Sequence, residues 1–593
     1  MKQFFLTMAG VFAGLLVFFV VVPIILISTA MGAASSKEPV HARSVLELDL
    51  RGGLTDQAPN NPFASFGGGG LAVMDVIQTL DRAEEDDRIK VVLIRLPEGG
   101  ISPAAADELR QAIRRFRAAG KPVIAHSQGL SPVGAVVSTY MVGASSGELW
   151  MQPNASFQAT GLYSETIFFG RAFEKYGVEA DFEQRYEYKN AVNTYTQSGY
   201  TEAHREAQTA WMGSVYESAL AAAAQDRRRT PADLRAALEG GPYSAEEALE
   251  AGLIDRAGHV REAEAEALRR AGDGAQLIEF SDYAAAIGRH RGSGRNAIAI
   301  VGGEGAIVTG EGVADPFGSG SMMFSDDIAR AIYDAIEDDA VKAIVFRVSS
   351  PGGSPEGSEQ ILAAVRAARA AGKPVVVSMG SYAASGGYWV SSEASAIVAQ
   401  PSTLTGSIGV FGGKFVFDEA LGRFGLDIEG ISVGGEYADA FNARTRFNAA
   451  ERAEFAGWMD RIYDDFIERV ARGRNLPEAR VREIARGRVW TGAQARQLGL
   501  VDELGGLHEA IARARALAEI PEDEQVRFKY YPQPKTAWEA LSEAFGVSGE
   551  AARALVMIGG VTRDPQARAV IDQVRTERMR ARGAAVLADQ PLP

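Results

Sequence analysis

The sequence predicts a mixed α/β protein that contains two copies of one domain behind an N-terminal membrane-spanning helix. Three observations support this fold class: short buried runs alternate with helical patterns, the chain repeats itself, and a long uncharged apolar run opens it. Strands that alternate with helical patterns of about 10–15 residues form βαβ units, and such units build mostly parallel sheets.

The internal repeat is the strongest of these observations. Residues 75–96, DVIQTLDRAEEDDRIKVVLIRL, align without gaps on residues 327–348, DIARAIYDAIEDDAVKAIVFRV, an offset of 252 residues. The tripeptide Gly-Lys-Pro recurs at the same offset, and residues 247–258 align on residues 494–505 at an offset of 247. Matches that keep their order over most of both copies indicate a duplication.

Each copy shows the same order of predicted elements. A strand (44–50 or 297–301) leads through a Gly-rich loop into an amphipathic helix, and a buried strand (91–96 or 343–348) follows. A long Ala- and Arg-rich helix, a further strand and a turn come next, and each copy ends in charged helices. From these patterns we predict an anchor at 1–34, an N-terminal copy at 35–290, a C-terminal copy at 291–548 and a tail at 549–593.

The N-terminal run predicts a membrane anchor. No ionisable side chain occurs between Phe4 and Ala34, and this run exceeds the roughly 20 residues that are needed to cross a bilayer. A cleaved signal peptide is the alternative, because small residues follow the run. The apolar core of a signal peptide, however, normally spans about 7–15 residues and is shorter than this run. The flanking charges, Lys2 on one side and Lys37 and Arg43 on the other, do not decide the orientation.

The composition excludes several classes of function. A net charge of −15 argues against a nucleic-acid surface, because phosphate binding requires clustered positive charge. The chain has no cysteine, which excludes disulfides, cysteine nucleophiles and thiolate metal sites. Its 6 histidines show no metal-ligand spacing such as HxxxH, so we expect no metal site.

The candidate catalytic turn is SYAASGGYW, residues 381–389, between a predicted strand and a predicted helix. Two glycines follow Ser385, and such a turn can expose one hydroxyl and leave the next backbone N–H free for a substrate oxygen. At the offset of 252, the N-terminal copy has Val133 in place of this serine. The loop SSPGGS (349–354) has also lost its second glycine there, to Ile101. The C-terminal copy therefore holds the intact turn and loop.

At one lysine position the copies differ in the opposite sense, because the N-terminal copy has the reactive side chain and the C-terminal copy lacks it. Residues 187–193, EYKNAVN, align on residues 436–442, EYADAFN, so that Lys189 lies opposite Ala438. A serine in one copy and a lysine in the other suggest one active centre assembled from both copies. The alternative interpretation of Lys189 is an ordinary solvated surface lysine.

A serine hydroxyl needs a base to act as a nucleophile. The histidine of the C-terminal copy, His508, lies in its terminal helical part, and His126 of the N-terminal copy is expected in a core strand. A neutral lysine can act instead if burial lowers its pKa from about 10.4 toward roughly 7–8, which costs on the order of 4 kcal/mol. Such a lysine requires a water-poor pocket with hydrogen-bond partners.

The sequence resembles the signal peptide peptidase A (protease IV) family in its long, two-copy form. The resemblance covers roughly residues 45–518 and the N-terminal anchor, and its most specific pieces are VSSPGGS, YAASGGYW, PSTLTGSIGVFG and YEYKNA. It implies a crotonase-like α/β fold, related to the Clp protease, and a serine peptidase with a Ser/Lys dyad. The residue roles that it implies are Ser385 as nucleophile, Lys189 as general base, Gly353 and Gly386 as oxyanion-hole donors, and Ser407 as a hydrogen-bond partner of the lysine.

One departure from the family pattern concerns Glu187. The lysine segment of the family commonly reads GKYKS, and Glu187 stands where the earlier lysine would be. In an extended strand its carboxylate would point to the same side as Lys189 and would stabilise the charged amine. We therefore expect Glu187 to be turned away or paired, with Arg185 as the candidate partner.

The resemblance also implies substrates, location and assembly. The substrates would be hydrophobic peptides, namely signal peptides left after preprotein cleavage, and no metal or nucleotide cofactor would be needed. The anchor would cross the lipid of the bacterial cytoplasmic membrane once and place the catalytic body on the periplasmic side. Members of the family assemble as tetramers with active sites facing a central cavity. Whether the lysine reaches the serine within one chain or across a subunit boundary stays open.

Two alternative functions remain at this point. Crotonase-like folds also bind acyl-CoA thioesters, with the same pair of backbone N–H groups and no nucleophile, but such an enzyme needs neither Ser385 nor a membrane anchor. A catalytically silent membrane scaffold is the second alternative, because duplicated enzymes can lose activity. The intact serine, glycines and lysine argue against it.

Overall fold

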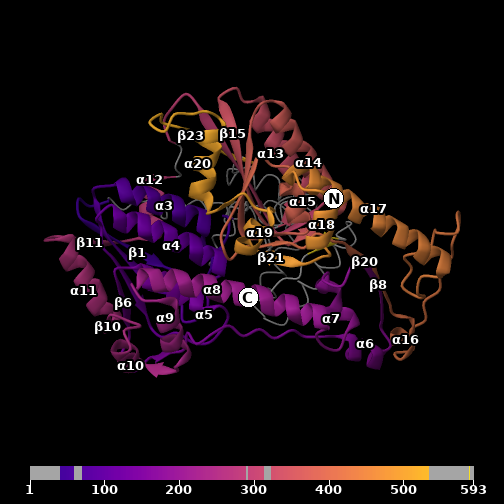
Figure 1. Ribbon diagram of the computed structural model, residues 1–593, viewed down its shortest axis with the longest axis horizontal. Coiled ribbons are helices and arrows are strands. Elements are labelled where there is room, and N and C mark those ends of the chain that lie inside the picture. The colour runs from indigo at the N-terminus through magenta and orange to yellow at the C-terminus, as the bar shows by residue number, and fades with distance from the viewer. Residues whose placement is uncertain (1–39, 59–69, 289–291, 313–321, 533–585, 588–593) are drawn as a thin grey trace, which may run out of the picture.

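The computed structural model shows a mixed α/β protein organised around two large sheets (Figure 1). It describes residues 40–58, 70–288, 292–312, 322–532 and 586–587. Within these ranges, no helix is both long and apolar enough to span a bilayer. The predicted anchor at 1–34 lies outside the described residues, as does nearly all of the predicted tail.

The N-terminal copy contains a parallel sheet with helices on both faces. The strand order is β10 (Arg256–Ala257), β6 (Glu148–Met151), β5 (Val123–Ser127), β4 (Ile89–Leu96), β1 (Ser44–Asp49) and β11 (Gln276–Glu279). Leu46 packs with the helices of one face and Val45 with the helix of the other, because successive side chains of a strand point to opposite faces. The first face carries α3 (Val73–Glu85), α4 (Pro103–Ala118), α5 (Val136–Ser145) and α8 (Glu202–Asp226), and the second carries α11 (Val260–Ala271).

The C-terminal copy repeats this arrangement around a mostly parallel sheet. The main strand order is β21 (Val489–Thr491), β19 (Leu404–Gly406), β17 (Val375–Ala384), β15 (Val341–Ser350), β12 (Ala297–Glu304) and β23 (Arg527–Tyr531). Strand β18 (Ala396–Ala399) pairs with β17 and with β22 (Glu503–Leu504). One face carries α13 (Ser325–Glu337), α14 (Pro355–Ala370), α15 (Gly386–Ser391) and α17 (Ala449–Arg474), and the other carries α20 (Leu507–Leu517).

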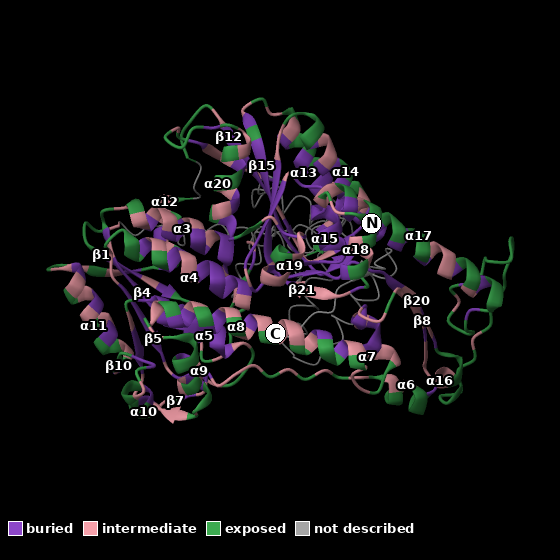
Figure 2. Cartoon of the chain, viewed as in Figure 1, coloured by how far each residue is buried: buried purple, intermediate pink, exposed green. Residues whose placement is uncertain are grey.

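The two copies match element by element. Helices α3 and α13 begin and end at residues that differ by 252, and so do α4 and α14. The duplication that the sequence predicts is therefore confirmed in the fold. Both sheets are buried and the outward faces of the surrounding helices are exposed, so each copy has its own core (Figure 2).

Several shorter elements connect these layers. They are β2 (Leu54–Thr55), β3 (Leu71–Ala72), β7 (Ser156–Phe157), α6 (Gly170–Tyr176), β8 (Glu179–Gln184), η3 (Asn190–Val192), α7 (Asn193–Thr196), α9 (Pro231–Glu239), β9 (Tyr243–Ser244), α10 (Ala245–Glu250), α12 (Phe280–Ile287), β13 (Ala306–Val308), β14 (Met322–Phe324), β16 (Gly352–Gly353), β20 (Phe411–Val416), α16 (Asp418–Gly422), α18 (Glu478–Ile484), α19 (Gly492–Leu498) and β24 (Val586–Leu587).

An arm of the N-terminal copy, residues 158–196, reaches across to the C-terminal copy. Its strand β8 pairs antiparallel with β20, from Phe411 opposite Gln184 to Val416 opposite Glu179. The two strands lie side by side at the right of Figure 1, far from the indigo sheet of the N-terminal copy. This pairing brings the lysine segment that follows β8 to the C-terminal copy.

Candidate active site

Ser385 occupies a sharp turn between β17, which ends at Ala384, and α15, which begins at Gly386. Its backbone has φ 55° and ψ −119°, a conformation that is strained for a residue with a Cβ atom and that recurs at nucleophile turns. Its N–H donates to Gly406 O at 2.8 Å, and its carbonyl accepts from Trp389 N at 2.9 Å. The side chain is fully buried. The surrounding strand and helix thus fix the direction of the hydroxyl.

The side chain of Lys189 ends at this hydroxyl. Its Nζ lies 2.8 Å from Ser385 Oγ, 2.9 Å from Ser407 O and 3.0 Å from Ser407 Oγ. Lys189 is 1% exposed, so it is not the solvated surface lysine of the alternative interpretation. Both groups belong to the same chain, which answers the question that the sequence left open.

Two glycines of the C-terminal copy make room for the lysine. A Cβ atom on Gly487 would lie 2.6 Å from Lys189 N, and a Cβ atom on Gly409 would lie 3.3 Å from Lys189 Cδ. Gly487 has φ +80°, a value that glycine adopts at little cost. Sequence reasoning did not identify either glycine as part of the site. Gly409 stands in the quoted motif PSTLTGSIGVFG, whereas Gly487 lies outside every motif.

Glu187 is paired, as expected, but its partner is not Arg185. Its carboxylate lies 2.7 Å from Arg486 of the C-terminal copy. The prediction of Arg185 is wrong because that guanidinium faces α17, where it contacts Asp460 and donates to Ala456 O at 2.6 Å. The charge of Glu187 is therefore compensated at the surface, where its side chain is 40% exposed.

The predicted oxyanion-hole glycines lie next to each other. A Cβ atom on Gly386 would be 3.1 Å from Gly353 N, so the two backbone segments are packed closely. Gly353 has φ +155°, and a Cβ atom there would overlap Ile307 O of β13. The loop then enters α14, whose N-cap Ser354 accepts from Gly357 N at 3.1 Å. Only glycine fits at position 353 in this conformation, whereas the other copy has Ile101 at the corresponding position.

Comparison with known proteins fits this geometry. The model of "Peptidase family S49" matches residues 115–272 and 367–521, one segment in each copy. The chain belongs to peptidase family S49. It is therefore a serine-type peptidase with two S49 domains.

Relatives from bacteria and plants share most of this S49 chain. "Protease 4" of Salmonella typhi is 31% identical over 87% of this chain and 84% of its own length. "Protease 4" of Haemophilus influenzae is 31% identical over 77% of this chain and 75% of its own length. "Serine protease SPPA, chloroplastic" of Arabidopsis thaliana is 30% identical over 86% of this chain and 74% of its own length.

An extended segment of the S49 chain itself lies beside the loop of Gly352 and Gly353. Strand β24 pairs antiparallel with β16, with Val586 opposite Gly353 and Leu587 opposite Gly352. The backbone of this loop therefore forms a strand pair with an extended segment of the chain.

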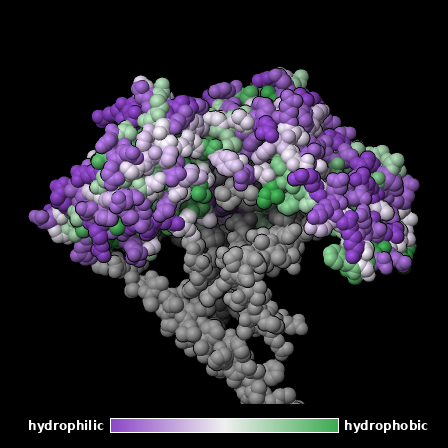
Figure 3. Space-filling view, turned by 90° about the horizontal axis from the view of Figure 1, so that it is seen from below, coloured by the Kyte–Doolittle hydropathy of each residue, from purple (hydrophilic) through white to green (hydrophobic). Residues whose placement is uncertain are grey.

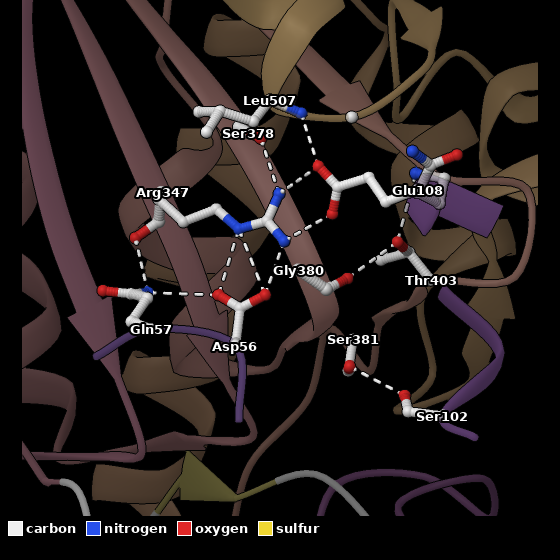
Figure 4. Close-up of polar contacts among 12 residues, drawn as sticks. Asp56, Gln57, Ser102, Glu108, Arg347, Ser378, Gly380, Ser381, Thr403 and Leu507 are labelled. Carbon is white, nitrogen blue, oxygen red and sulfur yellow. Dashed lines mark hydrogen bonds and ion pairs between the residues drawn. The ribbon is translucent and has the colours of Figure 1, made fainter. Parts of the chain in front are cut away.

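A buried ionic cluster joins the two S49 copies at the strands that lead to this site (Figure 4). Arg347 of β15 is 1% exposed and donates to Asp56 Oδ2 at 3.0 Å and to Glu108 Oε2 at 2.7 Å, both from the N-terminal copy. It also donates to Ser378 Oγ of β17 at 3.0 Å. Further along the same strand, Ser381 Oγ lies 2.8 Å from Ser102 Oγ. The N-terminal copy thus holds the two strands that lead to Gly353 and Ser385.

Two further acids at this junction have raised pKa values. Burial raises the pKa of Glu304 to about 7, and the nearby Asp56 carboxylate acts in the same direction. The Glu304 carboxylate accepts from Gln57 N at 3.0 Å. Burial also raises the pKa of Asp107 to about 6, although Ser402 N donates to it at 3.1 Å. Around Arg347, the carboxylates of Asp56, Glu108 and Glu304 therefore lie near one guanidinium.

Neither of the histidines considered as bases lies at the site. His126 is buried in β5, as expected, with Nε2 3.1 Å from Gly258 O, and burial lowers its pKa to about 4. His508 lies in α20, where its Nδ1 is 3.5 Å from Asp81. The basic group that the structure places at the serine is Lys189.

Proposed function

We propose that this S49 serine peptidase hydrolyses hydrophobic peptides with Ser385 as nucleophile and Lys189 as general base. The observation that carries the proposal is the 2.8 Å separation of Lys189 Nζ and Ser385 Oγ inside one chain. General bases act within about 2.6–3.2 Å of the proton that they remove, so the separation suits direct transfer.

The surroundings of Lys189 favour its neutral form. Burial disfavours a charged amine, and the three contacts described above are with neutral oxygen atoms of Ser385 and Ser407. A neutral amine has two hydrogens and one lone pair. With its hydrogens donated to Ser407 O and Ser407 Oγ, the lone pair faces the Ser385 hydroxyl.

The reaction then follows in two stages. Ser385 Oγ attacks the peptide carbonyl while Lys189 takes the hydroxyl proton, and the N–H groups of Gly353 and Gly386 stabilise the oxyanion. One such donor contributes roughly 3–4 kcal/mol to transition-state stabilisation. The lysinium gives its proton to the leaving amine, and an acyl-enzyme on Ser385 remains. Water, deprotonated by Lys189, hydrolyses the acyl-enzyme and restores the hydroxyl.

We further propose that the substrates are cleaved signal peptides, bound in extended form. Support comes from the strand pair between β24 and β16, which shows that an extended segment fits beside the loop. The apolar run at Phe4–Ala34 supports an anchor in the bacterial cytoplasmic membrane with the catalytic body on the periplasmic side. A homotetramer is proposed from the family resemblance.

An acyl-CoA enzyme is a weaker candidate. It would use the paired backbone N–H groups but would leave the Ser385–Lys189 contact without a role. The chemistry of a thioester ligand does not require a buried amine at a serine hydroxyl.

The test uses the purified full chain in detergent and an internally quenched apolar peptide. Ser385→Ala and Lys189→Met are each expected to lose hydrolysis by at least about 10²-fold, because general-base catalysis contributes about 10²–10⁴-fold. Lys175→Met is the matched control, since Lys175 is an exposed lysine of the same arm. Full activity in Lys189→Met would overturn the dyad. Turnover of an acyl-CoA thioester that survives Ser385→Ala would favour the alternative function, and equal turnover of a polar peptide would overturn the substrate class.

A further inference from the structure

The lysine segment (residues 185–189) has little regular structure of its own. Strand β8 ends at Gln184 and η3 begins at Asn190, so the segment lies between two elements. Tyr186 has φ 67°, a value that is uncommon outside glycine and that costs free energy unless the surroundings hold it. A base on such a segment reaches a serine reproducibly only if contacts from the rest of the molecule fix its main chain.

The clamp loop, residues 485–488 between α18 and β21, supplies such contacts from the C-terminal copy. A Cβ atom on its Gly487 would lie 2.7 Å from Lys189 Cα, so the loop packs directly against the main chain of the lysine. The carbonyl of Arg488 accepts from Ser407 N at 2.7 Å. Because Ser407 in turn accepts from Lys189 Nζ, the clamp loop supports the lysine at both its main chain and its amine.

Arg486 of the clamp loop reaches over the residues before the lysine. Its Nη2 lies 2.7 Å from Glu187 Oε1, and its guanidinium carbon lies 5.8 Å from the centre of the Tyr186 ring. Arg486 itself has φ 56°, a second costly backbone conformation within this contact. One arginine therefore contacts the residues that come two and three positions before Lys189.

Arg488 makes similar contacts one step further along the lysine segment. Its guanidinium carbon lies 4.9 Å from the centre of the Tyr188 ring, and its Nη2 donates to Glu206 Oε1 of α8 at 2.7 Å. A guanidinium over an aromatic ring contributes about 0.5–2 kcal/mol, depending on its exposure to water. The two arginines of the clamp loop thus lie over two tyrosines, Tyr186 and Tyr188, with Gly487 between them.

The N-terminal copy has no arginine at these two positions. The segments that form α10 and α19 begin at residues that differ by 247, and each begins with a capping box. At that offset, Arg486 corresponds to Glu239 and Arg488 to Gly241. The copy that holds Ser385 therefore has both arginines, and the copy without a serine lacks both. Among the residues of the clamp loop, the copies differ in the same way as they do at the serine.

Ordinary surface ion pairs are the alternative interpretation of these contacts. Most of the coloured surface in Figure 3 is hydrophilic, and pairs between exposed side chains contribute only about 0–1 kcal/mol to stability. Arg486 and Glu187 are 48% and 40% exposed, so their pair belongs to this class by energy. Its position gives it a larger effect on the reaction, because a displacement of about 1 Å at a reacting group can cost roughly 10²-fold in rate.

We propose that Arg486 and Arg488 are positioning residues for the reaction, which hold the main chain of Lys189 so that its amine reaches Ser385. The inference rests on the proposed dyad and adds two residues that act through the lysine. Without the arginines, the lysine segment separates from the clamp loop, the contact of 2.8 Å between Nζ and Oγ lengthens, and water reaches the amine. Water stabilises the charged form of an amine, so the neutral form then requires a higher pH.

The charges around the lysine segment allow positioning to be distinguished from a simple charge effect. They form the pairs Glu187–Arg486, Glu206–Arg488 and Arg185–Asp460. Arg486→Ala leaves Glu187 unpaired, and Glu187→Ala leaves Arg486 unpaired. A charge effect alone would move the pH profile upward in the first variant and downward in the second, because a nearby carboxylate favours the charged amine and a guanidinium disfavours it. Positioning predicts an upward move in both.

The test measures peptide hydrolysis and its pH dependence with the full chain in detergent. Arg486→Ala, Glu187→Ala and Arg488→Ala should each lower kcat by about tenfold to 10²-fold, leave KM within about twofold and raise the pH of half-maximal kcat. The exchange variant Glu187→Arg/Arg486→Glu should recover most of kcat and the wild-type pH profile, because it restores the pair in reverse. Arg482→Ala is the matched control and should behave as wild type, since Arg482 of α18 is 41% exposed and lies 2.8 Å from Asp464.

Hydrogen exchange of the amides of residues 186–190 adds a readout that is independent of hydrolysis. These amides should exchange faster in the three single variants than in Arg482→Ala, and unchanged exchange would overturn the proposal. Wild-type kcat and pH profile in Arg486→Ala and Arg488→Ala, a downward move in Glu187→Ala, or an exchange variant no better than the single variants would also overturn it. Lys189→Met separates this result from the dyad: full activity there refutes the dyad, whereas a large loss there beside wild-type clamp-loop variants refutes the positioning role alone.

Discussion

Replacing Arg347 with methionine is expected to loosen the strands that carry the active site. Methionine fills much of the same volume, but it leaves the carboxylates of Asp56 and Glu108 buried, each with a side chain only 4% exposed. Removing one partner of a buried ion pair costs about 3–5 kcal/mol, because an uncompensated charge stays in the interior. The hydrogen bond to Ser378 on the serine-bearing strand is lost as well.

Hydrogen exchange followed by mass spectrometry measures this effect locally. A loss of about 3–5 kcal/mol corresponds to a fall of roughly 10²–10³-fold or more in the protection of β15 and β17 amides, provided that they exchange through the opening of this junction. This readout is preferable to a single unfolding midpoint, because a chain with two copies need not unfold in one step.

Two further variants separate the charge effect from loss of packing. Arg461→Met removes an exposed guanidinium, 64% exposed and 3.5 Å from Glu454, and should change protection by less than about 1 kcal/mol. Adding Asp56→Asn and Glu108→Gln to Arg347→Met should recover part of the loss, since no buried charge is left alone. If the β15 and β17 amides are as well protected from exchange in Arg347→Met as in Arg461→Met, the role given to the cluster is refuted.

Three more predictions concern the site and its support. Glu304 has a folded pKa of about 7 against an ordinary 4.5, so its stabilising contribution is complete below about pH 4.5 and is lost as the pH rises through 7. After correction for the intrinsic pH dependence of exchange, β12 amides should therefore exchange more slowly at pH 5.5 than at pH 8. Glu304→Gln should reduce that difference, and a difference that is unchanged in the variant would contradict the assignment of the pH dependence to Glu304. Gly353→Ala should lower kcat by about 10²–10³-fold, because the new Cβ overlaps Ile307 O and displaces an oxyanion-hole donor; near-normal kcat would remove Gly353 from that role. Ser407→Ala removes a contact of 3.0 Å with Lys189 Nζ and should lower kcat about tenfold to hundredfold with KM unchanged. A change confined to KM would argue against a role of Ser407 in holding the lysine.

The duplication made much of the fold predictable, because the elements predicted in one copy can be checked against those predicted in the other. The 252-residue offset aligns the segments that form α3 and α13, and it also aligns those that form α4 and α14. Comparison of the copies, at an offset of 252 for Ser385 and of 249 for Lys189, shows that the serine stands in one copy and the lysine in the other. The β8–β20 pair brings these two side chains together. Sequence periodicity does not reveal which strands of different copies pair, so the route of the arm could not be predicted.

The parts that sequence reasoning missed are contacts between distant segments. Arg185 is near Glu187 in sequence, but the side chain that pairs with Glu187 is Arg486, almost three hundred residues later. Arg347 has an arginine counterpart, Arg95, in the other copy, so comparing the copies gave no sign of a special role. Burial and partners distinguish the two, since Arg347 contacts two acids of the other copy, whereas Arg95 lies 3.5 Å from Glu47 of its own copy.

The central claim is that Lys189 removes the proton of Ser385, and the rate at which Ser385 is acylated tests it most directly. An acylating β-lactone that labels the serine is followed from pH 5 to pH 10 in the wild type and in Lys189→Met, with the labelled peptide identified by mass spectrometry. The wild-type rate should rise through one titration to a plateau. The variant should label Ser385 about 10²–10⁴-fold more slowly and without that titration. Labelling of Ser385 in Lys189→Met at the wild-type rate, with the same pH profile, would contradict the account.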